Sequence, residues 1–234
     1  MKVQESSRLE ALVTRYQGSP LLRGLIQLLV HWEPTGVAGA LEARLVTKIQ
    51  NVREERLKTF FDELEAGKIQ LTRELIESED FLHCYFATVR AALNSRRREK
   101  IQMFARLLKS SAMPLSFSGT DEYEEYLSIL DDLSYREILV LATLERYIGQ
   151  FPLGPEENEL QRANRFWDDF TKELEHNLGL PAGEIDGVLT RLNRTGCYET
   201  FTGAYLDYSG GRGRLTATYF RLRKLVEAED GRFP

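Results

Sequence analysis

Residues 134–227 carry the pattern that most restricts the fold of this chain. Three stretches have apolar residues spaced three and four apart, which predicts three helices, each with one apolar face. A segment rich in aromatic and threonine residues follows and is typical of strands. The glycine-rich run SGGRGR at 209–214 interrupts it, and glycines accept the positive φ angles of a hairpin turn. A last helix is expected from about Thr218 to Glu227.

Local signals predict where these elements begin and end. Ser134 and Glu137 form the S-x-x-E pattern of a capping box, so a helix begins there and ends near Gly149 and Pro152. A long acidic helix follows and is stopped by Gly179. This acidic helix spans about Glu156 to Leu178. The remaining predicted elements are a third helix, opened by Leu180-Pro181 and ended by Thr195-Gly196, and strands at Cys197–Thr202 and Tyr205–Tyr208.

The order of three helices, a hairpin and a final helix resembles the winged-helix superfamily of bacterial regulators. The best match is Leu189, Leu192 and Gly196 in the pattern L-x-x-L-x-x-x-G, followed by the hairpin and by Leu215-Thr216. The resemblance covers roughly the last 100 residues and departs in its unusually long, acidic second helix. It implies that the third helix docks in the DNA major groove while the hairpin, or wing, touches phosphates.

A helical wheel of the third helix tests what the resemblance implies. Thr190, Arg191 and Arg194 lie on or beside the face opposite the apolar residues, and Arg212 and Arg214 lie at the wing. We take these five as candidate DNA contacts. The same helix face also carries two glycines and two acidic neighbours, which do not suit base readout. They are Gly183, Gly187, Glu184 and Asp186.

The opposing hypothesis is a non-enzymatic protein-interaction or assembly module whose winged helix does not bind DNA. It would use the aromatic-rich helices and would require a contiguous exposed apolar patch. The aromatic residues concerned are Phe81, Tyr85, Phe86, Phe166 and Trp167. A helical bundle that senses a small ligand is a third hypothesis.

Residues 1–112 predict an all-helical bundle with short connections, which matches no family pattern. Its longest periodic segment runs from about Ala40 to Ala66. In residues 113–133 we expect a linker, which is rich in Pro, Ser and Gly at its start, followed by a connecting helix. Residues 134–234 form the predicted winged-helix domain. The expected fold class is therefore mostly α, with a helical bundle, a winged-helix domain and a small β-hairpin.

Charge and composition restrict the partners. The formal net charge of −5 argues against a chain that coats nucleic acid along its whole surface, although local basic patches such as Arg96-Arg97-Arg98 with Lys100 remain. No signal pattern opens the chain, and its longest apolar stretch, 21–30, is too short to span a membrane, so a cytoplasmic location is expected. Cys84 and Cys197 are expected to be buried free thiols.

The sequence contains no nucleotide-binding, hydrolase or metalloprotease motif, and its three histidines are scattered. We therefore expect no enzymatic activity, no cofactor and no metal. The expected partners are double-stranded DNA, a protein, or a second copy in a homodimer.

Overall fold

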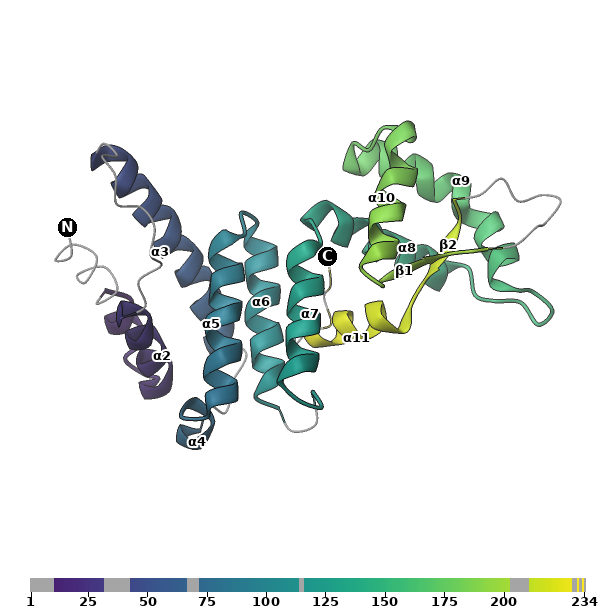
Figure 1. Ribbon diagram of the computed structural model, residues 1–234. Helices are drawn as coiled ribbons and strands as arrows, with labels where there is room; N and C mark the ends of the chain where they lie inside the picture. Colours follow the sequence, from purple (N-terminus) through teal and green to yellow (C-terminus); the bar gives the residue numbers. More distant parts are fainter. Residues whose placement is uncertain are drawn as a thin grey trace. The chain divides into compact units, whose positions relative to one another are not determined.

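A computed structural model of the protein describes residues 11–31, 43–66, 72–113, 116–202, 211–228, 231 and 233. Within these residues the chain is mostly helical, as predicted, with a two-stranded antiparallel sheet near its C-terminal end (Figure 1). The chain divides into two compact units, residues 1–127 (unit 1) and 128–234 (unit 2). The division falls inside the segment 113–133 that the sequence marks as connecting.

Unit 1 is built from helices. Its first described residues, 11–15, are helical. The labelled helices that follow are α2 (Pro20–His31), α3 (Ala43–Ala66), α4 (Arg73–Ile76), α5 (Glu79–Asn94), α6 (Arg98–Ser111) and the first part of α7 (Thr120–Asp132).

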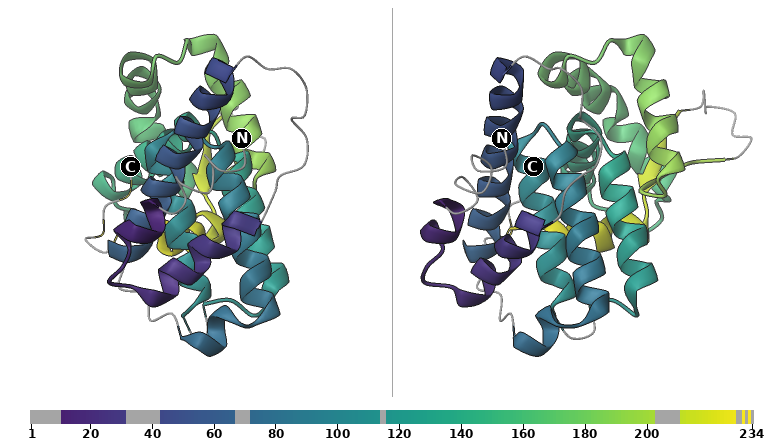
Figure 2. Two further views of the ribbon diagram at one scale, coloured as in Figure 1. Left: turned by 90° about the vertical axis from the view of Figure 1, so that its left-hand side faces the viewer. Right: turned by 60° about the vertical axis from the view of Figure 1, so that its left-hand side comes forward.

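The core of unit 1 lies where α3, α5 and α6 pack side by side (Figures 1 and 2). Helix α5 illustrates why the sequence folds this way. The Ser78 hydroxyl caps its N-terminus by accepting from the backbone N–H of Phe81 at 3.1 Å. Phe81, Tyr85 and Val89 recur at steps of four and are all buried. Burying each side chain of this size contributes about 1.5–3 kcal/mol.

Four of the five aromatic residues that the protein-interaction hypothesis names lie in the hydrophobic cores of the two units. Phe81 and Tyr85 are buried in unit 1, while Phe166 and Trp167 are buried in unit 2. Phe86 is only partly exposed. Four of the five side chains are therefore enclosed by the protein itself and are not available to a partner in the folded chain.

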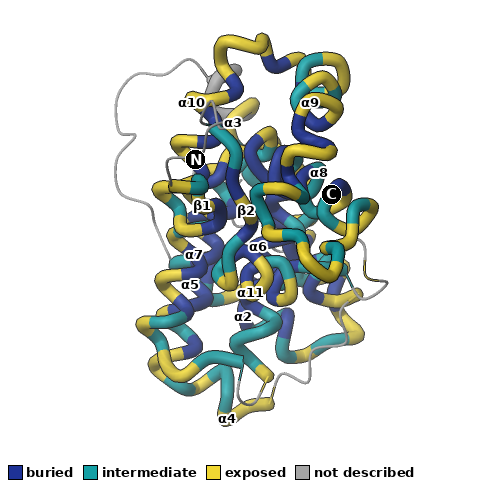
Figure 3. The backbone as a smooth tube through the Cα atoms, turned by 90° about the vertical axis from the view of Figure 1, so that its right-hand side faces the viewer, coloured by how far each residue is buried: buried dark blue, intermediate teal, exposed yellow. Residues whose placement is uncertain are grey.

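Unit 2 contains helices and the two-stranded sheet. They are the last part of α7, then α8 (Tyr135–Gln150), α9 (Glu159–Leu178), α10 (Ala182–Arg194), β1 (Tyr198–Thr200), β2 (Gly213–Leu215) and α11 (Ala217–Val226). The strands pair antiparallel, with Glu199 opposite Arg214. Along the helices buried and exposed residues alternate, so that each helix turns one apolar face inward (Figure 3).

Helix ends in unit 2 follow the local signals in most cases. The capping box is confirmed, since Ser134 Oγ accepts from Glu137 N at 3.2 Å and Glu137 Oε2 accepts from Ser134 N at 2.8 Å. Gly179 ends α9 in the left-handed conformation with φ +59°. Helix α8 runs through Gly149 to Gln150, which shows that a glycine near a helix end does not always stop the helix.

Two predicted boundaries differ. Helix α9 begins at Glu159 instead of Glu156, because the Asn158 side chain caps it in a second capping box with Gln161. The first strand is also shorter than the predicted Cys197–Thr202. The predicted strand 205–208 and the turn residues 209 and 210 lie outside the described residues, as do 1–10, 32–42 and 67–71.

Both cysteines are free and buried, as expected. Burial raises the pKa of the Cys197 thiol to about 11. No helix in the described part of the chain is long and apolar enough to cross a membrane.

Candidate nucleic-acid interface

Helix α10 presents a polar face to solvent. Its apolar residues all point into unit 2 and are buried: Ile185, Val188, Leu189 and Leu192. Thr190, Arg191 and Arg194 are exposed, as the helical wheel predicts. Gly183 and Gly187 lie on the same exposed side, and a Cβ atom at either position would meet nothing within 4 Å. The backbone of α10 is therefore accessible to a partner at two successive turns.

The end of α10 leads directly into the sheet. Thr195 closes the helix by donating its hydroxyl to the Leu192 carbonyl at 2.7 Å. Gly196 follows with φ +74°, a conformation that favours glycine and turns the chain into β1. Strand β1 packs against α10 and pairs with β2, so the candidate residues of α10 and of the wing lie on adjacent elements of one unit.

The base of the wing is held by a tyrosine. Tyr198 donates its hydroxyl to the Gly211 carbonyl at 3.0 Å, and its ring lies across Gly213. A Cβ atom at Gly213 would come within 2.4 Å of that ring and within 2.3 Å of the Glu199 carbonyl oxygen. Position 213 therefore requires glycine because a larger side chain would not fit, and not because of a turn conformation.

Arg214 extends from β2 and binds two carboxylates. Its Nη2 lies 2.8 Å from Glu199 on the opposite strand, and its Nη1 lies 2.6 Å from Glu159 in the first turn of α9. Hydrogen bonds to Glu159 and then to Glu199 raise the pKa of the Arg214 guanidinium. The acidic helix α9 therefore contacts β2 through Glu159. Its carboxylate lies where it would repel a DNA phosphate that approached Arg214.

Arg191 is also paired. Its Nε donates to Glu137 Oε1 at 2.8 Å, while the other oxygen of that carboxylate completes the capping box of α8. Burial acts to raise the pKa of Glu137, but hydrogen bonds from Ser134 and Arg191 outweigh it and lower the pKa overall. The sequence pattern identifies Glu137 only as part of a helix cap. Its ion pair with Arg191, 54 positions later, is visible only in the folded structure.

The other candidates differ in their surroundings. Arg194 is exposed and has no ion pair with another described residue, whereas Arg212 is half-exposed. The Thr190 hydroxyl donates to the Asp186 carbonyl at 2.8 Å, one turn back along α10. The Asp186 carboxylate lies next to Gly211, where it would be 3.0 Å from a Cβ atom. An acidic group therefore sits between α10 and the wing.

The other basic cluster lies in unit 1, at the start of α6. Arg96, Arg97 and Arg98 are exposed. Lys100 is buried, and its ammonium group lies 5.5 Å from the centre of the Phe104 ring. Three of the four side chains are therefore accessible to an anion.

The described residues contain no group of three or more His, Cys, Asp or Glu side chains placed to hold a metal ion. Comparison with known proteins finds no matching family model, no matching curated protein and no matching solved structure.

Proposed function

We propose that unit 2 is a winged-helix module that binds double-stranded DNA, and that the chain is a regulatory protein whose unit 1 makes partner or oligomerisation contacts. One observation carries the proposal. Four of the five candidate residues, Thr190, Arg191, Arg194 and Arg214, are solvent-exposed on adjacent elements of one unit. Gly183 and Gly187 add an open stretch of backbone beside them, where a phosphate can approach closely.

The ion pairs of Arg191 and Arg214 weaken this interface without abolishing it. The pairs of Arg214 are exposed and such pairs are worth about 1 kcal/mol or less, so a DNA phosphate can replace either carboxylate as its partner. Glu137 is buried, so Arg191 is held more firmly, because its departure would leave a buried carboxylate without its cation. The displaced carboxylate nevertheless stays nearby and repels phosphate. We therefore expect duplex binding in the weak range of about 10⁻⁴ to 10⁻⁶ M that is typical of contacts to the DNA backbone.

The exposed apolar residues do not favour a protein partner at unit 2. The large, exposed hydrophobic residues of the described structure that lie in unit 2 are Leu153, after α8, and Phe220, on α11. Single exposed apolar residues of this kind are normal on any protein surface. In unit 1, Ile49 and Val52 are 47% and 36% exposed and lie one turn apart on α3. We place the partner or homodimer contact of the proposal there.

A second candidate function is a protein-interaction or assembly module whose winged helix does not bind DNA. The carboxylates of Glu137, Glu159 and Glu199 favour it, because they neutralise two of the four candidate arginines. A neutral protein surface releases few counterions from DNA when it binds, and this release drives most DNA binding.

Fluorescence anisotropy with a labelled duplex of about 20 base pairs at about 50 mM salt separates the two candidates. The double variant Arg194→Ala plus Arg212→Ala should bind about tenfold more weakly than the parent protein. The matched control is Arg96→Ala plus Arg98→Ala, which removes the same charge from unit 1 and should change the affinity by less than about twofold.

Each result decides between the candidates. If the parent protein shows no duplex binding, the proposal fails and the second candidate stands. If the control variant loses as much affinity as the wing and α10 variant, DNA binds elsewhere and the assignment of the interface to unit 2 is wrong.

A further inference from the structure

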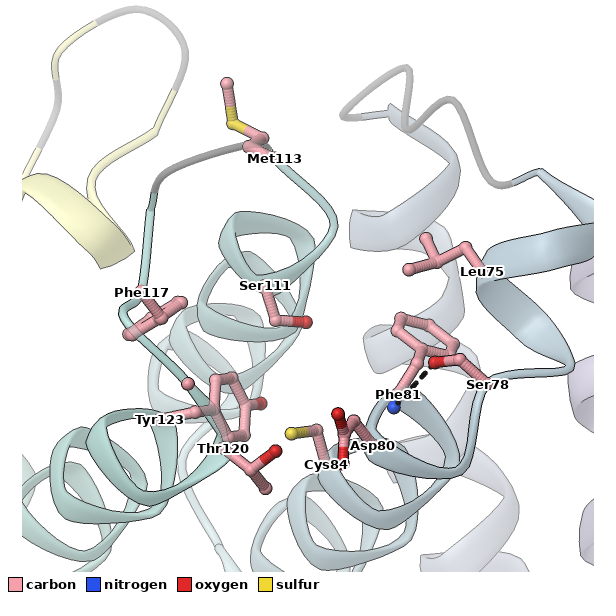
Figure 4. A pocket seen from close by; sticks show the side chains of 11 residues that line it. Leu75, Ser78, Asp80, Phe81, Cys84, Ser111, Met113, Phe117, Thr120 and Tyr123 are labelled. Carbon is pink, nitrogen blue, oxygen red and sulfur yellow. Dashed lines mark hydrogen bonds between the residues drawn. The ribbon is translucent and has the colours of Figure 1, made fainter.

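Unit 1 contains a hollow of about 180 Å³ between the starts of α5 and α7 and the end of α6. At about 30 Å³ for each water molecule, it has room for roughly six waters or one small ring. Its apolar wall is formed by Leu75, Phe81, Phe117 and Tyr123 (Figure 4). These side chains offer ring faces and aliphatic carbon, which is the usual lining of a small-molecule site.

Polar groups converge on the same hollow. The Asp80 carboxylate, the Cys84 thiol and the Thr120 hydroxyl turn toward its middle (Figure 4). Neither Asp80 nor Thr120 has a side-chain hydrogen bond or ion pair with another described residue. By contrast, Ser78 and Ser111 at the rim are already bonded to backbone groups, at 3.1 and 2.7 Å. The free hydrogen-bonding capacity is therefore concentrated beside the acidic group.

The sign of the charge follows from the surroundings. Among the described residues that line the hollow, one is acidic and none is basic. Burial, and after it the negative charges of Glu124 and Asp80, raise the pKa of the Cys84 thiol to about 11. The thiol therefore stays neutral. Asp80 lines the hollow, whereas the Glu124 carboxylate lies outside the lining and contacts His83 Nε2.

The N-termini of α5 and α7 also face this region and oppose the carboxylates. Each helix end carries roughly half a positive charge, so the two together supply about one unit. The first turns of the same helices already contain four carboxylates, of which Glu122 accepts from Ser118 N at 2.6 Å. Of these four carboxylates only Asp80 lines the hollow, so it is the charged group that a ligand inside would meet, and it favours a cation over an anion.

We propose that this hollow binds a small organic cation, an amine with a compact apolar or aromatic body, whose ammonium group bonds to Asp80 and Thr120. The body would lie against Phe81 and Phe117, whose ring faces also attract positive charge. The lining residues all belong to unit 1, so this proposal does not rest on DNA binding by unit 2.

The test uses three probes with the same ring and different charges: benzylammonium, benzyl alcohol and benzoate. Binding to the full-length protein is measured by saturation-transfer NMR and titration calorimetry at neutral pH. Benzylammonium should bind about tenfold more tightly than benzyl alcohol, and benzoate should bind least, because a charge-assisted hydrogen bond is worth about a factor of ten. Equal binding of the amine and the alcohol, or no binding of the amine, would overturn the proposal.

Two isosteric variants locate the site. Asp80→Asn should reduce benzylammonium affinity to that of the alcohol. Asp121→Asn is the matched control, since it also removes a carboxylate from the first turn of a helix but lies outside the hollow. It should leave the affinity unchanged, and thermal melting should show that both variants fold. If Asp80→Asn binds benzylammonium as tightly as the parent protein does, the amine is bound elsewhere and the proposal is wrong.

Discussion

At the residue scale, two glycines of unit 2 occupy opposite environments. Gly213 is enclosed by Tyr198 and by the backbone of β1, whereas Gly187 faces open solvent on α10. We expect Gly213→Ala to lower the free energy of unfolding by about 1–3 kcal/mol, because the added methyl group must displace a tyrosine ring and a strand carbonyl. Gly187→Ala should instead raise it by about 0.5–1 kcal/mol, because alanine is the better helix former.

Urea unfolding of the two variants compares them directly. Equal stability of Gly213→Ala and the parent protein would show that the ring of Tyr198 does not pack across β2.

The buried thiols predict how stability changes with pH. In the unfolded chain a cysteine has an ordinary pKa of 9.0, while burial raises the pKa of Cys84 and Cys197 to about 11 in the folded protein. The folded state therefore holds these protons more tightly. Its advantage is complete below pH 9 and is lost as the pH rises from 9 to 11.

The variant Cys197→Ala isolates one thiol. Between pH 8 and about 10.5 it should lose roughly 1–2 kcal/mol less unfolding free energy than the parent protein does, since one titrating group is gone. The measurement is urea unfolding at several pH values. An identical pH profile for the two proteins would mean that the Cys197 thiol does not titrate differently on folding.

At the element scale, local signals in the sequence predict the helix caps well. Ser134 and Gly179 act through groups within five residues along the chain, so their patterns are readable without the fold. The sequence predicts the start of α9 three residues too early, because acidic residues are also favoured in a first helical turn. Only the hydrogen bonds identify Asn158 as the cap.

The ion pairs of the candidate interface could not be read from the sequence. The pair of Glu199 with Arg214 depends on the register of the two strands, and the pair of Glu159 with Arg214 joins residues 55 positions apart. Such contacts arise when elements pack. The sequence predicts the exposure of Arg191 and Arg194 on α10. It assigns Arg214 to the hairpin turn, whereas Arg214 lies in β2, and it does not show how far the charge of the arginines is neutralised.

The carboxylates of Glu159 and Glu199 compete with DNA for Arg214, so removing their charge should change duplex affinity. Glu159→Gln plus Glu199→Gln should tighten duplex binding by about fivefold to tenfold, because Arg214 keeps its charge and loses two competing anions. The control Asp168→Asn plus Asp169→Asn makes the same change in net charge roughly 13 Å further along α9. Screening over a distance of about 10 Å should make the effect of the control smaller. Equal gains for both variants would indicate that only net charge matters.

At the scale of the whole molecule, the sequence predicts a mostly helical chain with a small sheet near its end, and the fold confirms this level of description. The spacing of the aromatic residues predicts apolar helix faces, but it does not show whether such a face packs inside the chain or against a partner. The hollow of unit 1 was beyond sequence reasoning, since its lining comes from α4 to α7 and their connections.

The central claim is that exposed arginines of unit 2 replace counterions on DNA phosphates. The most direct measurement is the affinity of the full-length protein for a duplex as a function of salt. If two to four arginines make phosphate contacts, the logarithm of the association constant should fall against the logarithm of salt concentration with a slope of about −2 to −4. A slope near zero, or no binding even at about 20 mM salt, would contradict the claim.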